Sequence, residues 1–206
     1  MASSSTCHSH PVEPPCRKKP CRTYNWLVKI YTRTGDGGET ALLGGERVSK
    51  AAPRVAAYGD VDELNAWLGF VRAGRVDAEL SAMLDRIQRD LFAIGARLAN
   101  PGGRVADRIE KAAVTADAAA QLEAWIDQLE SELAPLRRFI LAGGSPAGAA
   151  LHFARTICRR AERSVVSLGR EHVESEVLAY LNRLSDLLFV MARAANRRDG
   201  AAEVEW

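Results

Sequence analysis

The segment Ala154–Arg163, ARTICRRAER, carries the side chains best suited to chemistry in this chain, because half of them are charged within an otherwise apolar helical pattern. On an α-helix, Arg155, Arg159 and Glu162 would share one face. Guanidinium groups on a half-buried face need anionic partners, and their planar forks match phosphate oxygens. The segment therefore indicates a phosphate site. A solvated stripe of internal salt bridges is the simpler alternative.

A second segment that suits phosphate lies far upstream, where Thr32–Thr40 reads TRTGDGGET. Glycines let the backbone turn its N–H groups inward, and the hydroxyls and Arg33 add further donors. The pattern GxxxxGK[ST] of a Walker A loop is absent, and Gly-Asp-Gly-Gly also forms ordinary turns. The loop is therefore a candidate polyphosphate site that depends on the arginine segment for support.

Two polar pairs interrupt other helical patterns. Asp62 and Asn65 are one turn apart within YGDVDELNAWLG, and Asn182 and Asp186 are spaced i, i+4 within NRLSDLLF. Each pair alone is explained as well by a solvated helix face or a buried cap. Together with the arginines, they place carboxylates, amides and anion donors on three helices, which outlines a pocket.

The elements that must position these residues are helices. Apolar residues recur at helical spacing in five segments, and these are 53–74, 77–98, 115–133, 147–168 and 175–198. Thr115 is a plausible N-cap for the third helix, and Pro135 follows its end. Lys29–Thr34 is expected to be extended. Short connections and almost no strand pattern predict an all-α fold, a five-helix antiparallel bundle.

Composition narrows the class of protein. The 206 residues are 47% hydrophobic and 26% charged, which is ordinary for one globular domain. The net charge of +2 divides into +3 over residues 1–28 and −1 over the remainder. A nearly neutral body argues against nucleic-acid binding, and no run reaches the roughly 18 apolar residues of a membrane span.

We expect residues 1–28 to be a disordered basic tail, 29–200 to be the single domain and 201–206 to be a C-terminal tail. The N-terminal segment is rich in proline and lacks the apolar core of a secretory signal. It faintly resembles a transit peptide, although cytoplasmic location is the better expectation. A metal site is an open alternative for this segment, with Cys7, His8, His10, Cys16 and Cys21 as ligands.

Four motifs in order resemble the PduO-type ATP:cob(I)alamin adenosyltransferases, over about residues 29–198. They are KIYTRTGDGGET, PRVAAYGDVDELNAWLG, RFILAGGSPAGAALHFARTICRRAER and LNRLSDLLFVMARAAN. The resemblance implies a five-helix bundle that assembles into a homotrimer with sites between subunits. It also implies transfer of the 5′-deoxyadenosyl group of ATP to cob(I)alamin, with release of triphosphate. Because Co(I) itself is the nucleophile, no catalytic triad or reactive cysteine is needed.

The resemblance also assigns residues. The nucleotide-binding set is Thr32, Arg33, Thr34, Gly35, Thr40, Lys50, Arg155, Arg159, Glu162 and Asn182. Arg155 and Arg159 resemble the arginines that bind the phosphates and stabilise the transition state. Glu162 resembles a residue that contacts ATP or its Mg²⁺, and the phosphates are expected to hold most of the coordination sites of that ion. Asp62 resembles an intersubunit partner of Arg155. Phe139 resembles the aromatic residue that displaces the lower axial base of the corrinoid, and Asp186 is expected to contact the corrinoid.

Taken without the resemblance, Phe139 would be read as a core residue. Only a short segment follows Asn196, so an extended cover over the corrinoid is not expected. A reductase for cob(II)alamin and an adenosylcobalamin-dependent client enzyme are the expected protein partners. The alternatives are a carrier that delivers adenosylcobalamin with little turnover, and a non-catalytic helical interaction module. The intact set of arginines and polar residues argues against the second alternative.

Overall fold

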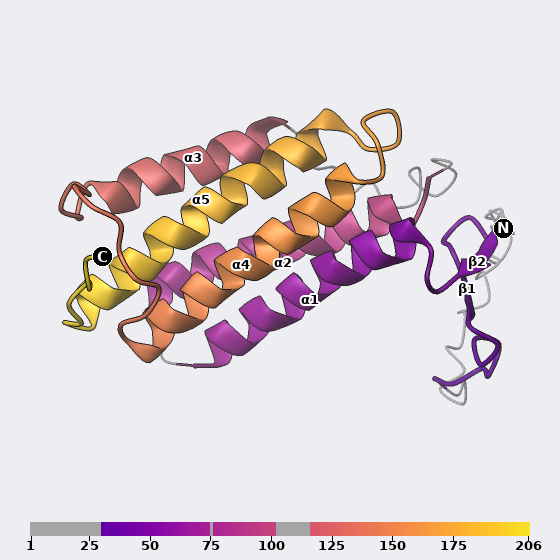
Figure 1. Cartoon of the computed structure of the whole chain (residues 1–206), viewed down its shortest axis with the longest axis horizontal. Coiled ribbons are helices and arrows are strands. Elements are labelled where there is room, and N and C mark those ends of the chain that lie inside the picture. The colour runs from indigo at the N-terminus through magenta and orange to yellow at the C-terminus, as the bar shows by residue number, and fades with distance from the viewer. Residues whose placement is uncertain (1–29, 75, 102–115) are drawn as a thin grey trace, which may run out of the picture. The chain divides into compact units, whose positions relative to one another are not determined.

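The structure is a computed structural model that describes residues 30–74, 76–101 and 116–206. These residues contain five helices and two short strands (Figure 1). The elements are β1 (Glu39–Ala41), β2 (Arg47–Ser49), α1 (Pro53–Ala73), α2 (Ala78–Leu98), α3 (Ala116–Glu130), α4 (Pro146–Val166) and α5 (Ser175–Arg198). The predicted all-α bundle is confirmed. The expected tail 1–28, its metal alternative and the predicted cap Thr115 lie outside the described residues.

Local sequence signals set where the helices begin. Proline occupies the start of α1 and of α4, where a missing N–H removes no helical hydrogen bond. The Asp77 carboxylate accepts a hydrogen bond from the Leu80 N–H at 2.9 Å and caps α2. The Ser145 hydroxyl does the same for α4 by accepting from the Gly148 N–H at 3.1 Å. The ends of α1, α2, α4 and α5 therefore fall within two residues of those that the sequence predicts, whereas α3 ends at Glu130, three residues before the predicted end at 133.

Helix α4 lies between α1 and α5, while α2 packs on α1 and α3 packs on α5 (Figure 1). Their apolar stripes are buried in one continuous core. Within it, the Cys158 thiol donates to the Leu181 carbonyl at 3.4 Å and joins α4 to α5. Burial raises the pKa of this thiol far above its ordinary value. Cys158 is therefore an inert packing residue at the centre of the bundle.

Asn196 of α5 fixes the start of α4. Its side chain accepts a hydrogen bond from the Ser145 N–H and donates one to the Gly143 carbonyl, each at 2.9 Å. A Cβ atom at Gly148 would overlap the buried amide of Asn196. The glycine-rich loop before α4 therefore serves close packing against α5, which places the whole arginine-bearing helix.

The expectation of almost no strand missed a small hairpin in the glycine-rich region. β1 and β2 pair antiparallel with Glu39 opposite Ser49, and Arg47 binds the Glu39 carboxylate at 3.1 Å. Arg47 also donates to the Thr34 carbonyl at 2.8 Å. Strands of three residues are too short to show a period-2 pattern, so sequence alone could not reveal them.

Residues 201–206, set apart as a tail in the sequence, lie against the bundle. The Trp206 N–H donates to the Phe139 carbonyl at 2.9 Å, and the Leu141 N–H donates to the Val204 carbonyl at 2.8 Å. The buried Arg193 of α5 binds Glu203 at 2.7 Å and also donates to the Ala134 carbonyl. The ion pair therefore holds this segment to α5, and the antiparallel bridge between Ile140 and Glu205 holds it to the loop before α4.

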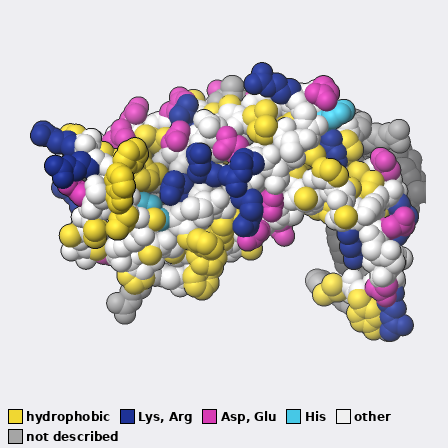
Figure 2. All heavy atoms as spheres, viewed as in Figure 1, with side chains coloured by type: hydrophobic (Ala, Val, Ile, Leu, Met, Phe, Trp, Pro, Cys, Tyr) yellow, Lys and Arg dark blue, Asp and Glu magenta, His cyan; other side chains and the backbone are white. Residues whose placement is uncertain are grey.

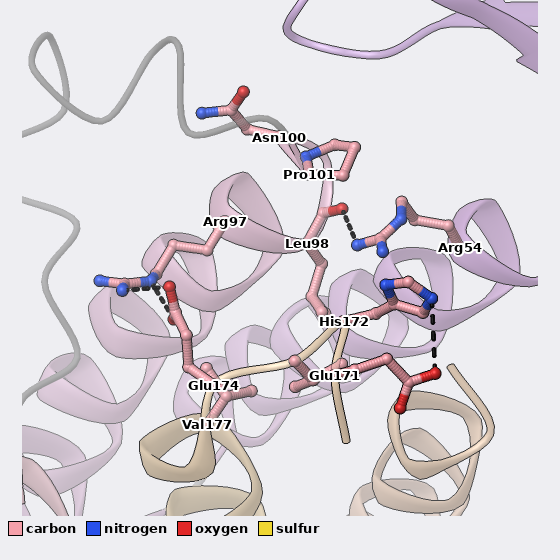
Figure 3. A pocket seen from close by; sticks show the side chains of 10 residues that line it. Arg54, Arg97, Leu98, Asn100, Pro101, Glu171, His172, Glu174 and Val177 are labelled. Atoms are coloured by element: carbon pink, nitrogen blue, oxygen red, sulfur yellow. Dashed lines mark hydrogen bonds and ion pairs between the residues drawn. The ribbon is translucent and has the colours of Figure 1, made fainter. Parts of the chain in front are cut away.

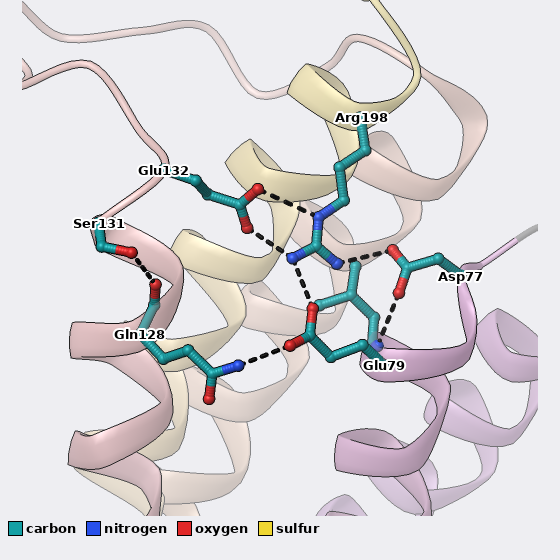
Figure 4. Close-up of polar contacts among 7 residues, drawn as sticks. Asp77, Glu79, Gln128, Ser131, Glu132 and Arg198 are labelled. Atoms are coloured by element: carbon teal, nitrogen blue, oxygen red, sulfur yellow. Dashed lines mark hydrogen bonds and ion pairs between the residues drawn. The ribbon is translucent and has the colours of Figure 1, made fainter.

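Arg198 joins three helices at one end of the bundle (Figure 4). Its guanidinium contacts the carboxylates of Asp77 at 2.9 Å, Glu79 at 2.6 Å and Glu132 at 2.5 Å. Burial favours the protonated form of Asp77, but the Leu80 N–H and the Arg198 guanidinium together hold its pKa below the usual value. The cluster ties the start of α2 and the end of α3 to the end of α5.

Residues 30–33 belong to a unit separate from residues 34–206. Within that unit, the Arg33 guanidinium carbon lies 5.6 Å from the centroid of the Tyr31 ring. Among the described residues, no helix is long and apolar enough to cross a membrane.

Candidate active site

A cavity of about 820 Å³ opens between α3, α4, α5 and the loop that precedes α4. We call it the arginine cavity. It brings together Arg155 and Arg159 from α4, Asp186 from α5 and Phe139 from the loop, which are four of the residues that the sequence singled out. The rest of its wall is largely apolar, and includes Ile126, Leu136, Ile140, Phe189 and Val190.

Arg155 is poised at the wall of this cavity. Its guanidinium carbon lies 5.9 Å from the centroid of the Phe189 ring, which is within cation–π range. Its Nε is buried and has no hydrogen-bond partner. A buried guanidinium nitrogen without a partner is costly, so the geometry favours an anion or a carboxylate that arrives from outside this chain.

His152 lies one turn before Arg155 and is 3% exposed. Its ring packs edge-on to Phe189, with 5.8 Å between centroids. Burial lowers the pKa of His152, and the nearby Arg155 charge lowers it further. The imidazole is therefore neutral near pH 7 and adds no competing positive charge beside the arginine.

The predicted helix face continues beyond the cavity. Glu162 accepts a hydrogen bond from the Asn182 amide at 3.1 Å, so these two residues of α4 and α5 lie together as the sequence indicated. Asp186, which lines the cavity, binds Arg183 of the same helix at 2.8 Å. Figure 2 shows Lys and Arg side chains gathered over the middle of α4 and α5. The surface of α4 and α5 beside the cavity therefore gathers positive charge.

The glycine-rich loop forms a second, separate group of donors. The Gly38 carbonyl accepts from the Lys50 N–H at 2.8 Å, and a Cβ at Gly35 would lie 3.2 Å from the Lys50 Nζ. Thr34, Gly35, Thr40 and Lys50 are thus gathered by one hairpin, with Thr40 in β1. None of them lines the arginine cavity. Thr32 and Arg33 belong to the separate unit of residues 30–33.

Asp62 is exposed on α1. Within the described part of this chain, it forms no ion pair with Arg155. Its neighbours on the helix do bind α4: Asp60 accepts from the Ser164 hydroxyl at 2.5 Å, and Glu63 pairs with Arg160. The carboxylate of Asp62 is therefore exposed to contacts from outside this chain.

Sequence reasoning missed two features of the cavity. The sequence motifs did not single out Phe189, which lies beneath the Arg155 guanidinium. Glu130 of α3 also lines the wall, and no local pattern distinguishes it from other exposed glutamates. Ser185 and Phe189 are spaced i, i+4, so they share a helix face, and Asp186 is adjacent to Ser185 in sequence. This spacing is the signal in the sequence that could have placed Phe189 beside a polar site.

A second cavity, of about 390 Å³, lies between the start of α1, the end of α2 and the α4–α5 connection (Figure 3). Its cationic groups already have partners in this chain. Arg54 donates to the Leu98 carbonyl at 3.1 Å, Arg97 binds Glu174 at 2.5 Å, and His172 faces Glu171 at 3.5 Å. It is therefore less suited to a polyanion than the arginine cavity is.

The chain is thus an all-α bundle with an arginine-lined cavity and a separate glycine-rich hairpin, two candidate sites for a polyphosphate. Residues 30–195 match the cobalamin adenosyltransferase family. The chain belongs to that family.

Individual relatives agree. A cobalamin adenosyltransferase of Cupriavidus metallidurans is 45% identical over 184 residues, which cover 88% of this chain and 96% of that protein. The corrinoid adenosyltransferase PduO of Citrobacter freundii is 47% identical over 168 residues, and the match spans 50% of its length. A solved variant of the PduO-type ATP:corrinoid adenosyltransferase from Lactobacillus reuteri, complexed with cobalamin and ATP, has a TM-score of 0.79 and 39% identity. It covers 86% of this chain and 99% of its own.

Proposed function

We propose that this protein transfers the 5′-deoxyadenosyl group of ATP to cob(I)alamin, giving adenosylcobalamin and triphosphate. The observation that carries the proposal is the arginine cavity, where two arginines of one helix face share a hollow with the exposed ring of Phe139. One cavity thus offers cations for a polyphosphate and an apolar surface for a corrinoid. Family membership supplies the reaction that needs both.

In this reaction the Co(I) electron pair attacks the ribose 5′-carbon of ATP. A Co–C bond forms, the C5′–O bond breaks, and the bonding pair leaves with triphosphate. The chain must align the two reactants and stabilise the negative charge that grows on the leaving group. Arg155 and Arg159 serve the second task, since their guanidinium groups can bind phosphate oxygens in pairs. Asn182 holds the ribose or adenine end.

The glycine-rich hairpin binds the rest of the nucleotide, through Thr34, Gly35, Thr40 and Lys50 together with Thr32 and Arg33. Because the hairpin residues do not line the arginine cavity of the same chain, we place the complete site between subunits of a homotrimer. The hairpin of one subunit then faces α4 of the next. Asp62 meets Arg155 across this interface, which gives the unpartnered Nε its acceptor and orients the guanidinium.

Magnesium fits this site chiefly through the nucleotide. The described residues contain no cluster of three or more His, Cys, Asp or Glu side chains that could hold a metal. Glu162 is the one carboxylate of the groove assigned to it, and its side chain already accepts from Asn182. When bound, Mg²⁺ supplies charge neutralisation on the phosphates. Glu162 then positions that complex while Lys50 and the arginines hold the remaining oxygens.

Phe139 and Asp186 form the corrinoid side of the cavity. Phe139 is 82% exposed and lines the arginine cavity. Its ring has no atom that can coordinate cobalt, so a corrinoid seated against it would lose its lower axial base. Removal of that ligand makes cob(II)alamin easier to reduce to the nucleophilic state.

The test is conversion of cob(I)alamin and MgATP to adenosylcobalamin under anaerobic conditions, followed by the corrinoid spectrum and by triphosphate release. Arg155→Ala should abolish conversion, with a loss of about 10³-fold or more in kcat. Arg170→Ala removes an exposed arginine of the α4–α5 connection and is the matched control, expected to be unchanged.

Conversion that persists in Arg155→Ala would remove this arginine from the mechanism. Wild-type protein that binds ATP and corrinoid tightly but gives no product would instead favour an adenosylcobalamin carrier. We further propose two protein partners, a reductase that supplies the electron and a client enzyme that receives the product. We propose a cytoplasmic location for the protein. Co-purification with a flavin- or iron-dependent reductase would support the first of these.

A further inference from the structure

His152 is a buried titratable side chain that the proposed mechanism does not use. It lies on α4 one turn before Arg155 and is 3% exposed. Within the described part of the chain, neither Nδ1 nor Nε2 of its ring has a hydrogen-bond partner. An unpartnered buried polar group destabilises a fold, and an apolar ring would fill the same space without that cost. Stability therefore does not explain an imidazole at this position.

Phe189 of α5 connects His152 to Arg155. The imidazole packs edge-on against the Phe189 ring, with 5.8 Å between centroids and 60° between the ring planes. The Arg155 guanidinium carbon lies 5.9 Å from the centroid of the same ring. Residues three apart on a helix lie on the same side, so α4 presents both side chains to one aromatic ring. The tilt of that ring therefore depends on His152, and the place of the guanidinium depends on the ring.

His152 acts from behind the cavity wall. Phe189, Arg155 and Arg159 line the arginine cavity, and His152 is not among its described lining residues. The imidazole therefore influences a bound phosphate only through Phe189 and Arg155, which makes it a group that positions and not one that touches the reactants.

The charge state of His152 decides whether it helps or opposes Arg155. Among the described residues, charge reaches it from Arg155 of α4 and from Glu203 of the C-terminal segment. Glu203 is already bound by Arg193 of α5 at 2.7 Å, so its attraction for a second cation is reduced. Burial lowers the pKa of His152 most, the Arg155 charge lowers it further, and Glu203 opposes both effects. Protonation would place two positive charges one turn apart against one ring.

We propose that His152 is a positioning residue for Arg155 in adenosyl transfer. The neutral imidazole packs the Phe189 ring beneath the guanidinium and so holds Arg155 where negative charge develops on the leaving triphosphate. A proton on His152 repels Arg155 from that place, so transfer requires the neutral form. The inference rests on the proposed function for the reaction. It goes beyond that function by assigning the loss of activity in acid to one side chain.

The experiment is the pH dependence of kcat between about pH 8 and about pH 5, with saturating cob(I)alamin and MgATP. His152→Phe keeps a ring against Phe189 but takes no proton, so at the upper pH its kcat should stay within about threefold of wild type. Towards the lower pH, wild-type kcat should fall by about threefold or more relative to this variant. His152→Ala removes the ring and should lower kcat by about 3- to 10-fold at the upper pH, with little change in the KM for ATP.

Two further measurements separate positioning from packing. His172→Gln is the matched control, because it removes an exposed imidazole of the α4–α5 connection, and its kcat should follow the wild-type profile. Titration of His152 by NMR in wild-type protein with isotope-labelled histidine needs no change in the core. Its midpoint should coincide with the acid limb of kcat, and Arg155→Ala should raise the midpoint by removing the neighbouring charge.

Equal acid limbs in wild type and His152→Phe would overturn the inference, and so would a His152 midpoint that lies away from the acid limb. Wild-type protein that gives no adenosylcobalamin at any pH would overturn the proposed function instead. In that case a midpoint that rises in Arg155→Ala would still support the link between the two side chains, and one that stays fixed would overturn it.

Discussion

The Arg155 guanidinium lies over the Phe189 ring, with 5.9 Å from its central carbon to the ring centroid, while its Nε is buried without a partner. The aromatic face holds the cation from one side and leaves its hydrogen-bond donors directed elsewhere. His152 packs against the same ring, and its lowered pKa leaves it neutral, so it adds no second positive charge beside Arg155. Arg155 is therefore prepared for anionic partners before ATP arrives.

Replacement of the ring tests this preparation. Phe189→Leu keeps an apolar side chain of similar volume but removes the aromatic face, so the guanidinium loses a contact worth about 1–2 kcal/mol in a desolvated site. We expect kcat to fall by about 5- to 30-fold with little change in the free energy of unfolding. Steady-state kinetics beside urea unfolding would show this, and equal kcat in the variant would mean that Phe189 only packs.

Asp62 should act on Arg155 and not on folding, because it is exposed in the isolated subunit. Asp62→Asn removes the charge and keeps the shape, so kcat should fall by about 10²-fold while the assembly stays intact. Kinetics and light scattering on one preparation separate the two effects. Glu63→Gln is the control, since Glu63 pairs with Arg160 inside the subunit. Normal turnover in Asp62→Asn would exclude the pairing from the mechanism.

The Arg193–Glu203 pair should matter for stability far more than its surface neighbours do. Glu203→Gln removes the carboxylate charge and leaves the buried guanidinium of Arg193 with neutral acceptors, the glutamine oxygen and the Ala134 carbonyl, so the free energy of unfolding should fall by about 1–3 kcal/mol. Glu205→Gln is the matched control, because its partner Arg138 is exposed and 3.6 Å away. The control should cost less than about 1 kcal/mol. Equal losses in urea unfolding would contradict this view.

The Arg198 cluster predicts acid sensitivity. The folded-state pKa of Asp77 is lowered by the Leu80 N–H and by Arg198, against the effect of burial. Its stabilising contribution is therefore complete above the ordinary value of 3.8 and is lost as pH falls through the lowered folded-state value.

Asp77→Asn retains a capping oxygen but not the charge, so near pH 7 it should be less stable than wild type by about 0.5–1 kcal/mol. The difference should shrink between about pH 4 and pH 2. Urea midpoints across this range measure it. Asp199→Asn, which changes an exposed carboxylate outside the cluster, is the control and should change the free energy of unfolding near pH 7 by less than about 0.5 kcal/mol. A gap that persists at pH 2 would show that the side-chain shape and not the charge is responsible.

Helical periodicity in the sequence predicted both the helices and the shared face of Arg155 and Arg159 that lines the cavity. Helical periodicity is local, so the ends of α1, α2, α4 and α5 follow from caps and apolar spacing, and residues such as Arg155 and Arg159 fall on one face by geometry alone. Their meeting with Phe139 is nonlocal and came only from the family resemblance.

The remaining features depend on pairings that no local pattern encodes. Trp206 reaches Phe139 through backbone hydrogen bonds across more than sixty residues, and backbone pairing leaves little trace in side-chain type. Phe189 looks like every other apolar residue of α5 until the Arg155 guanidinium is placed above it. A polar residue near the end of a helix, such as Asn196, is expected to be exposed. Asn196 is nevertheless 2% exposed, because the absence of a side chain at Gly148 lets α4 approach it closely.

The buried thiol of Cys158 can report how often α4 and α5 separate. It is fully buried between the two helices that carry the arginine groove, and its thiolate is strongly disfavoured there. An alkylating reagent can reach it only during the moments when α4 and α5 part. The labelling rate at this one position, read by peptide mass spectrometry, therefore reports how often the groove opens, and a bound nucleotide that clamps α4 should slow it.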